Sequence, residues 1–269
     1  MEVSGKISDS IRKDRLREEV WKKVDRFVSG PKPVQGKIPN FHGAKSAAER
    51  LVSTSEFQNA QVVKVHPSLN AIPFREQVLR LGKTLIVPPL PGHDFLYFRV
   101  NPESVKNKRY NWAAQKRGFN RIGVPLQLED IPNIDMFVVA ATVVSPEGCR
   151  AGKGKGYGEV EWGIASELGV VDSSTVVATL VHDVQVVSPE QFPSEMMESH
   201  DLPVDLIATP NRIIHCQCIQ NEQMISTRES VLSTPKLRRP KGIIWEKIDH
   251  QMFEDIGALK ALKLKLSKE

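Results

Sequence analysis

The sequence predicts a three-layer α/β fold in which a mostly parallel sheet carries helices on both faces. Between residues 61 and 209, short β-branched runs alternate with segments of helical periodicity, as in chains that build parallel sheets. The run Ile134 to Val144 is apolar without period-two polarity, as expected for a central strand covered on both faces. With 269 residues and 40% hydrophobic content, the chain can bury a core of ordinary size.

An amphipathic helix is predicted over Ser8 to Val28. It opens with serine and aspartate as cap candidates, and apolar residues recur at near-helical spacing while lysine and arginine fill the other face. The stretch Gly30 to Pro39 is rich in helix-breaking residues and is predicted to be a loop. A short helical pattern resumes from Phe41 to Leu51.

The remaining elements follow in order along the chain. We expect strands at 61–65, 84–87, 134–144, 175–181 and 204–209, and helices at 74–81 and 158–168. Beyond Ile219 the composition becomes polar and charged, and a terminal helix is expected from about His250 to Leu266. The sequence therefore predicts a main domain over 1–216 and a C-terminal extension over 217–269.

The strongest functional signal is the glycine loop, which runs from Gly148 to Glu159 between the long apolar run and a predicted helix. Its glycines let backbone amides approach an anion closely, its cations add positive charge, and the helix start adds a positive dipole end. The loop is therefore predicted to cradle nucleotide phosphates. Its spacing matches neither standard phosphate-binding pattern, so a flexible surface loop is the alternative. The predicted contacts from this loop are Arg150, Gly152, Lys153, Gly154, Lys155, Gly156 and Tyr157.

Two His-Asp pairs, at 182–183 and 200–201, flank predicted strands, and ligands of open α/β sheets bind at strand ends. Mg²⁺ prefers oxygen and usually takes one or two protein carboxylates plus substrate phosphates. Glu159 and Asp201 are therefore candidate metal ligands. The alternative for each His-Asp pair is that it caps a helix or a turn.

Composition narrows the possible classes of function. No stretch of 18 apolar residues exists, so no membrane span is expected, and the N-terminus lacks signal- and transit-peptide features, which predicts a cytoplasmic protein. A net charge of +5 and a pI near 9.0 suit an anionic ligand. The three cysteines, Cys149, Cys216 and Cys218, form no Cys-x-x-Cys pair, which indicates a reducing compartment and small core residues at 216 and 218. The absence of a Gly-x-Ser-x-Gly elbow argues against a serine hydrolase.

Basic and aromatic residues mix at 106–112 and at 116–119, including Lys108, Arg109 and Lys116. Such a mixture can stack bases and contact phosphates, so RNA is a possible partner. The alternative is an ordinary surface loop, because Asn120 to Ile122 break the aromatic alternation of an RNA-recognition strand.

Three motifs in order resemble the 5-formyltetrahydrofolate cyclo-ligase family, also called methenyltetrahydrofolate synthetase. They are Lys13-x-x-Leu-Arg17, the glycine run from Gly148 to Tyr157, and His200-Asp-x-x-Val-Asp-x-Ile-x-Thr209. The similarity covers roughly residues 8 to 214. The block Ile38-Pro-Asn-Phe41 is more similar to a divergent branch, the methenyltetrahydrofolate synthase domain-containing proteins.

The resemblance implies a cyclo-ligase-like, Rossmann-type fold over 1–216 that binds ATP and Mg²⁺ and takes a reduced folate as substrate. Family enzymes activate the formyl oxygen of 5-formyltetrahydrofolate by phosphorylation, and ring closure then gives 5,10-methenyltetrahydrofolate. It further implies nucleotide contacts from Lys13, Arg17 and the loop residues 150–157, and metal contacts from Glu159 and Asp201.

The sequence also departs from the family pattern. The usual Gly-Tyr-Tyr-Asp-Arg has become Gly156-Tyr-Gly-Glu-Val160, and His66 to Ile72 contain no acid where the family places a substrate-binding glutamate. These departures leave two alternatives open. One is a non-enzymatic module that binds RNA or a folate, and the other is an unrelated ATP-dependent ligase on the same scaffold.

Overall fold

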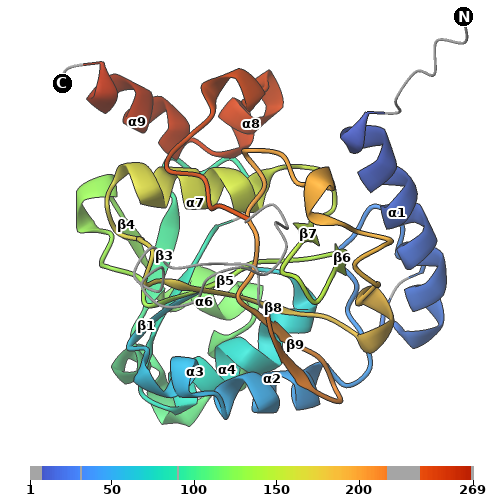
Figure 1. The fold of residues 1–269 in the computed structure, drawn as a ribbon. Helices are drawn as coiled ribbons and strands as arrows, with labels where there is room; N and C mark the ends of the chain where they lie inside the picture. Colours follow the sequence, from blue (N-terminus) through green and yellow to red (C-terminus); the bar gives the residue numbers. More distant parts are fainter. Residues whose placement is uncertain (1–7, 31, 90, 217–236, 268–269) are drawn as a thin grey trace, which may run out of the picture.

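An eight-stranded sheet lies at the centre of the protein, in the strand order β10-β9-β8-β5-β1-β2-β3-β4 (Figure 1). The computed structural model describes residues 8–30, 32–89, 91–216 and 237–267. The parallel strands are β1 (Val62–Val65), β2 (Thr84–Val87), β5 (Met136–Val138), β8 (Val176–Leu180) and β9 (Leu206–Ala208). The antiparallel strands are β3 (Tyr97–Val100), β4 (Val124–Leu126) and β10 (Ile213–His215).

Helices cover both faces of the sheet, which confirms the predicted three-layer α/β architecture (Figure 1). One face packs against α2 (Ala44–Val52), α3 (Ser55–Asn59), α4 (Ile72–Arg80), α5 (Tyr110–Ala113) and α6 (Lys116–Ile122). The other packs against α7 (Tyr157–Glu167) and α9 (Ala258–Leu266), with α8 (His250–Asp255) beside them. Short 3₁₀ turns lie at Asp25–Phe27, Leu69–Ala71, Pro102–Ser104, Lys106–Lys108, Leu128–Asp130, Asp183–Gln185, Ser194–Met196 and Trp245–Lys247.

Helix α1 (Asp9–Val24) begins where the sequence predicts, because the Ser8 side chain accepts a hydrogen bond from the amide of Ile11. Its apolar stripe is buried at Leu16, Val20 and Val24. This stripe packs near a small hairpin of β6 (Val143–Val144) and β7 (Arg150–Ala151), and it positions the polar face of α1 beside the glycine loop.

The predicted single strand over 134–144 is wrong, because the run divides into β5 and β6 (Val143–Val144). Strand β5 is central, as expected, between β1 and β8. Strand β6 leaves the main sheet and pairs with β7 (Arg150–Ala151) in a separate two-stranded sheet. Between β5 and β6, side chains take the place of neighbouring strands as hydrogen-bond donors to the backbone carbonyls. The Gln185 amide donates to the carbonyls of residues 141 and 142, and Arg150 donates to that of residue 140.

Two further expectations also need correction. The predicted terminal helix over 250–266 is two helices, because Ile256 leaves the helical conformation, with φ −119° and ψ 80°, and forms a β-bridge with His93. The segment interpreted as a surface loop at 106–119 contains α5 and the start of α6. Gly118 allows their contact, since a Cβ there would lie 1.9 Å from the Trp112 carbonyl oxygen.

Cys149 is buried and Cys216 is half-buried, whereas Cys218 lies outside the described residues. Within those residues, no helix has both the length and the apolar character that crossing a bilayer requires. The boundary proposed at 216 stays a prediction. The described part of the extension packs on α7, where the Trp162 indole donates to the Pro240 carbonyl at 2.9 Å.

Candidate functional site

Two cavities adjoin the glycine loop. The apolar cavity has a volume of about 240 Å³, and the charged cavity has a volume of about 270 Å³. Both are lined by Gly152, Lys155, Gly156 and Glu159. The further lining of the apolar cavity includes Ile38, His66, Pro67, Ser68, Pro88, Pro89, Pro91, Phe95, Leu96, Lys153, Tyr157, Glu161, Asp255 and Ile256. That of the charged cavity includes Lys13, Asp14, Arg17, Glu198, His200, Asp201, Ile243, Ile244, Lys247, Ile248 and Met252.

The glycine loop has the backbone conformation of an anion-binding turn. Gly154 and Gly156 have φ values of +88° and +64°, and α7 begins directly after Gly156 without a side-chain cap. In the described parts of the chain, no acceptor is recorded for the amides of residues 152 to 156. Amides without acceptors at the start of an 11-residue helix are suited to bind an anion.

Helix α1 brings its two predicted cations to this loop. Arg17 Nε donates to the Gly152 carbonyl at 2.7 Å, and its Nη1 lies 2.7 Å from Asp14 Oδ1. Lys13 is buried, and its Nζ lies 2.8 Å from Glu198 Oε2 and 2.6 Å from Asp201 Oδ2. Lys13 and Arg17 therefore line the same cavity as the glycine loop and the two acids. They are 135 or more residues away from these groups in the sequence.

The positive charge of Lys13 is held by its two acidic neighbours. Burial by itself lowers the pKa of Lys13, but the hydrogen bonds and charges of Asp201 and Glu198 outweigh burial and raise it. The hydrogen bond from Lys13 in turn lowers the pKa of Glu198. Lys13 therefore stays protonated and carries a full positive charge at neutral pH.

Arg150 is a buried cation that lines the apolar cavity and donates three hydrogen bonds to other parts of the chain. Its Nε donates to the Leu202 carbonyl at 2.8 Å, its Nη1 to the Ala140 carbonyl at 2.9 Å, and its Nη2 to the Glu159 carboxylate. The guanidinium thus joins three segments of chain behind the loop. Of the predicted loop cations, Lys153 and Lys155 are the two for which no ion pair is recorded among the described residues, and Lys153 lies 5.6 Å from the Tyr157 ring centroid.

The predicted metal ligands Glu159 and Asp201 both line the charged cavity. Each has one oxygen in a hydrogen bond, from Arg150 to Glu159 and from Lys13 to Asp201. Glu198, His200 and Asp201 also offer ligand atoms that lie within 4.8 Å of one another. Carboxylate oxygens beside a candidate phosphate site are the donor set that Mg²⁺ requires, so the residues fit the ion.

Glu161, which lines the apolar cavity, belongs to a buried ion pair that the sequence did not predict. The ammonium of Lys64, fully buried in the middle of β1, contacts the Glu161 carboxylate of α7 and lies 3.9 Å from the Phe137 ring centroid. Burial lowers the pKa of Lys64, and the Glu161 charge opposes that effect. A lysine inside the apolar run Val62 to Val65 was the sequence signal for such a pair.

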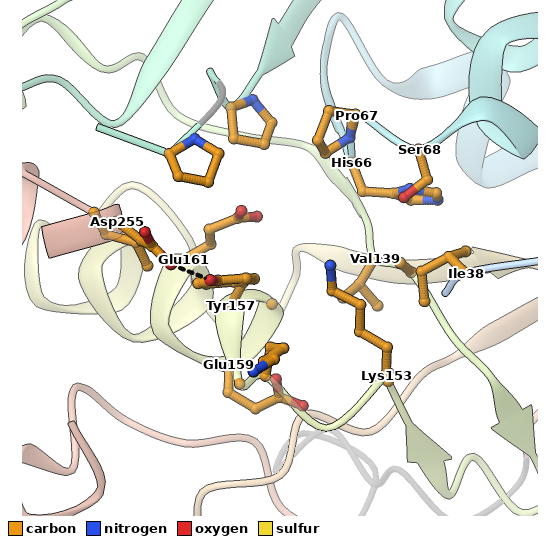
Figure 2. A pocket seen from close by; sticks show the side chains of 18 of the residues that line it. Ile38, His66, Pro67, Ser68, Val139, Lys153, Tyr157, Glu159, Glu161 and Asp255 are labelled. Atoms are coloured by element: carbon orange, nitrogen blue, oxygen red, sulfur yellow. Dashed lines mark hydrogen bonds between the residues drawn. The ribbon is translucent and has the colours of Figure 1, made fainter. Parts of the chain in front are cut away.

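The rim of the apolar cavity joins α7 to the C-terminal extension. Figure 2 shows the Tyr157 hydroxyl hydrogen-bonded to the carboxylate of Asp255 on α8. Burial, and then the hydrogen bond and charge of Asp255, raise the pKa of Tyr157 to about 12. His66 also lines this cavity, and among the described residues neither of its ring nitrogens has a hydrogen-bond partner. Burial and nearby cations lower the pKa of His66 well below its usual value, so this imidazole is neutral.

The other His-Asp pair has a structural role. The His182 side chain caps a 3₁₀ turn, and its ring stacks on Phe27 with centroids 4.4 Å apart. Asp183 accepts hydrogen bonds from Thr209 and Asn211. The capping alternative predicted for such pairs is confirmed at 182–183, and only the pair at 200–201 lines one of the two cavities.

Sequence comparison gives relatives for most of the chain. It is 33% identical over 256 residues to the methenyltetrahydrofolate synthase domain-containing protein of Homo sapiens, covering 94% of this chain and 62% of the relative. It is also 33% identical over 258 residues to that of Mus musculus, covering 95% of this chain and 64% of the relative. The chain thus spans less than two thirds of these relatives' lengths.

Among solved structures, the 5,10-methenyltetrahydrofolate synthetase of Aquifex aeolicus is similar with a TM-score of 0.49 and 19% identity, covering 79% of this chain and 98% of the other. Residues 9–210 match the sequence profile of the 5-formyltetrahydrofolate cyclo-ligase family. The match covers α1, the glycine loop, the acids at 198–201 and every strand of the sheet except β10. The chain therefore belongs to the 5-formyltetrahydrofolate cyclo-ligase family.

Proposed function

We propose that this protein binds Mg-ATP on the glycine loop and a reduced folate in the apolar cavity, and that it converts 5-formyltetrahydrofolate to 5,10-methenyltetrahydrofolate. The observation that carries the proposal is the shared wall of the two cavities. Gly152, Lys155, Gly156 and Glu159 line both, so ligands in the two cavities would meet at the loop. Transfer of a phosphoryl group needs such contact between donor and acceptor.

In this proposal the charged cavity holds the polyphosphate. The loop amides, Lys155 and Arg17 bind its oxygens, while Glu159 and Asp201 hold Mg²⁺, which neutralises charge that develops during the transfer. The observed contacts of Lys13 with Asp201 and of Arg150 with Glu159 fix both carboxylates in place. Lys13 then acts chiefly by orienting an acid.

The apolar cavity has features suited to a folate. Its prolines and Phe95 offer flat apolar surface for a pterin ring. Three acids also line it, Glu159 and Glu161 from α7 and Asp255 from α8. The segment from His66 to Ile72, where the family places its substrate-binding glutamate, supplies a neutral imidazole instead. In the proposal, Glu161 contributes the carboxylate that this segment lacks.

A direct test is ATP-dependent formation of the methenyl product, followed by its absorbance, with calorimetric titration of Mg-ATP alongside. Lys155→Ala and Arg17→Ala are expected to weaken Mg-ATP binding on the order of tenfold each, as for loss of one charged contact. Lys45→Ala is the control, because Lys45 lies on α2 with its side chain 78% exposed. Unchanged affinity in both the Lys155 and the Arg17 variant would remove the phosphate assignment.

The second candidate function is a folate-binding module without turnover. The lack of an acid in the segment from His66 to Ile72 favours it. Binding of both ligands with no absorbance change would select this alternative over the enzyme. RNA as a partner stays a prediction, and its candidate residues Lys108, Arg109 and Lys116 are exposed.

A further inference from the structure

We infer that the C-terminal extension forms the binding site for the nucleoside part of the bound nucleotide. This inference rests on the proposed function, since it needs a triphosphate on the glycine loop. It concerns a segment outside the family match, which ends at residue 210. The extension therefore adds to the family site a wall that the matched region does not contain.

The extension is fixed directly on α7. The Trp162 indole donates to the Pro240 carbonyl at 2.9 Å, and the Ile243 amide donates to Glu167 Oε1 at 3.1 Å. The backbones are in close contact, because a Cβ on Gly163 would lie 3.0 Å from the Gly242 carbonyl oxygen. These contacts hold residues 240–243 against the helix whose first turn adjoins the glycine loop, as Figure 1 shows for the segment leading to α8.

From this anchored position the extension supplies an apolar wall to the charged cavity. The wall consists of Ile243, Ile244, Ile248 and Met252, all half-buried. Three of them also pack on the core beneath α7, so their positions are set by the fold. Met252 reaches the loop itself, since its Cε would lie 2.5 Å from a Cβ on Gly156.

The rest of the charged cavity is polar, and the extension adds one cation to it, Lys247, whose Nζ lies 3.5 Å from Glu198 Oε1. Helix α1 and the 198–201 segment present Lys13, Arg17, Glu198 and Asp201, while the loop presents amides that lack acceptors in the described chain. A ligand that satisfies both sides needs a highly charged end and a flat apolar end. Inorganic polyphosphate has only the first, whereas a nucleoside triphosphate has both.

The base of the nucleotide is therefore expected to bind against the apolar wall. When the phosphates bind the loop, the base can pack against Ile248 and its neighbours. The removal of apolar surface from water stabilises that arrangement. The extension then acts as the element that distinguishes a nucleotide from a bare polyphosphate.

The experiment compares binding of Mg-ATP and of magnesium tripolyphosphate by calorimetry in the full chain. Ile248→Ala is expected to raise the Kd for ATP on the order of tenfold and to leave the Kd for tripolyphosphate unchanged, because the phosphates do not contact this side chain. Ile248→Trp, which fills the cavity, is expected to abolish ATP binding and to keep tripolyphosphate binding. Retained tripolyphosphate affinity also shows that each variant is folded.

Leu264→Ala is the matched control, because Leu264 lies in the same extension, is 64% exposed and lines neither cavity. It should change neither affinity. Equal effects of the Ile248 variants on both ligands, or no effect on either, would overturn the inference. So would a wild-type protein that binds ATP no better than tripolyphosphate, a result that leaves the phosphate cradle intact. A wild-type protein that binds neither ligand would instead contradict the proposed function.

Discussion

The ammonium of Lys13 lies 2.6 Å from Asp201 Oδ2, so a cation that the sequence assigns to the nucleotide holds a carboxylate that it assigns to the metal. The same relationship recurs at Arg150 and Glu159. In both pairs the cation fixes the acid, and in the proposed function it shields the acid's charge from the polyphosphate. Without these cations, the two acids beside the glycine loop would repel such a ligand.

The Lys13 cluster predicts an acid-dependent contribution of Glu198 to stability. The pKa of Glu198 is lowered in the folded protein, so its carboxylate stabilises the fold above the unfolded pKa and loses this effect as the pH falls through the folded pKa. The side chain is 34% exposed, so solvent screens the pair. We expect Glu198→Gln to cost about 0.5–1 kcal/mol near neutral pH and nothing in acid, measured by urea unfolding across this range.

Glu49→Gln provides the matched control, because Glu49 is 54% exposed and lies 3.9 Å from its lysine partner. It should show little cost at any pH. A cost for Glu198→Gln that stays constant down to strongly acid pH would contradict the assigned pair.

The buried pair of Lys64 and Glu161 predicts a large penalty for removing one partner. Lys64→Met leaves the Glu161 carboxylate without its cation, and we expect the free energy of unfolding to fall by about 3–5 kcal/mol. The double variant Lys64→Met/Glu161→Leu should recover most of this loss, since apolar residues of similar size replace buried ion pairs well. Chemical denaturation measures both, and a double variant as unstable as the single one would count against this account.

The contact between α7 and α8 predicts an unusual tyrosine titration. Tyr157, with a pKa raised to about 12, should ionise well above an ordinary tyrosine, because burial and then the hydrogen bond and charge of Asp255 disfavour the tyrosinate. Asp255→Asn should bring the pKa back toward 10, as read from tyrosinate absorbance during alkaline titration. Tyr157→Phe identifies the signal by deleting it. If Asp255→Asn left the titration unchanged, the contact would have no role in it.

A pair of glycines allows the packing of Met252 on the loop to be measured. Gly156 and Gly169 have φ values of +64° and +68°, but only at Gly156 would a Cβ meet a side chain, 2.5 Å from Met252 Cε. Gly169→Ala is expected to cost about 1–2 kcal/mol from backbone strain alone. Gly156→Ala should cost up to about 1 kcal/mol more, because the terminal methyl of the flexible Met252 side chain must move aside for the added methyl.

Addition of Met252→Ala to Gly156→Ala should remove the extra cost, and a double-mutant cycle by urea unfolding isolates that coupling. A coupling near zero would show that α8 does not rest on the loop.

The sequence predicted helices and strands correctly where the local pattern of apolar, capping or β-branched residues determined them. The apolar stripe of α1 and its serine cap located that helix, and the β-branched runs located β1, β2 and β8. Prediction failed where tertiary contacts overrode the local pattern. The apolar run 134–144 divided because side chains of Gln185 and Arg150 take over its carbonyls. The terminal helix divided because Ile256 forms a β-bridge with His93.

The sequence by itself determined the composition of the site, because the glycines, cations and acids of the loop, of α1 and of residues 198–201 can be read as residue types in order. Only the tertiary structure decided which of these groups are engaged with one another, and it added Lys64, Glu161, Met252 and Asp255. Their roles depend on contacts between segments distant in the chain. Such contacts are fixed by how α7, α8 and the sheet pack, and no local spacing encodes them.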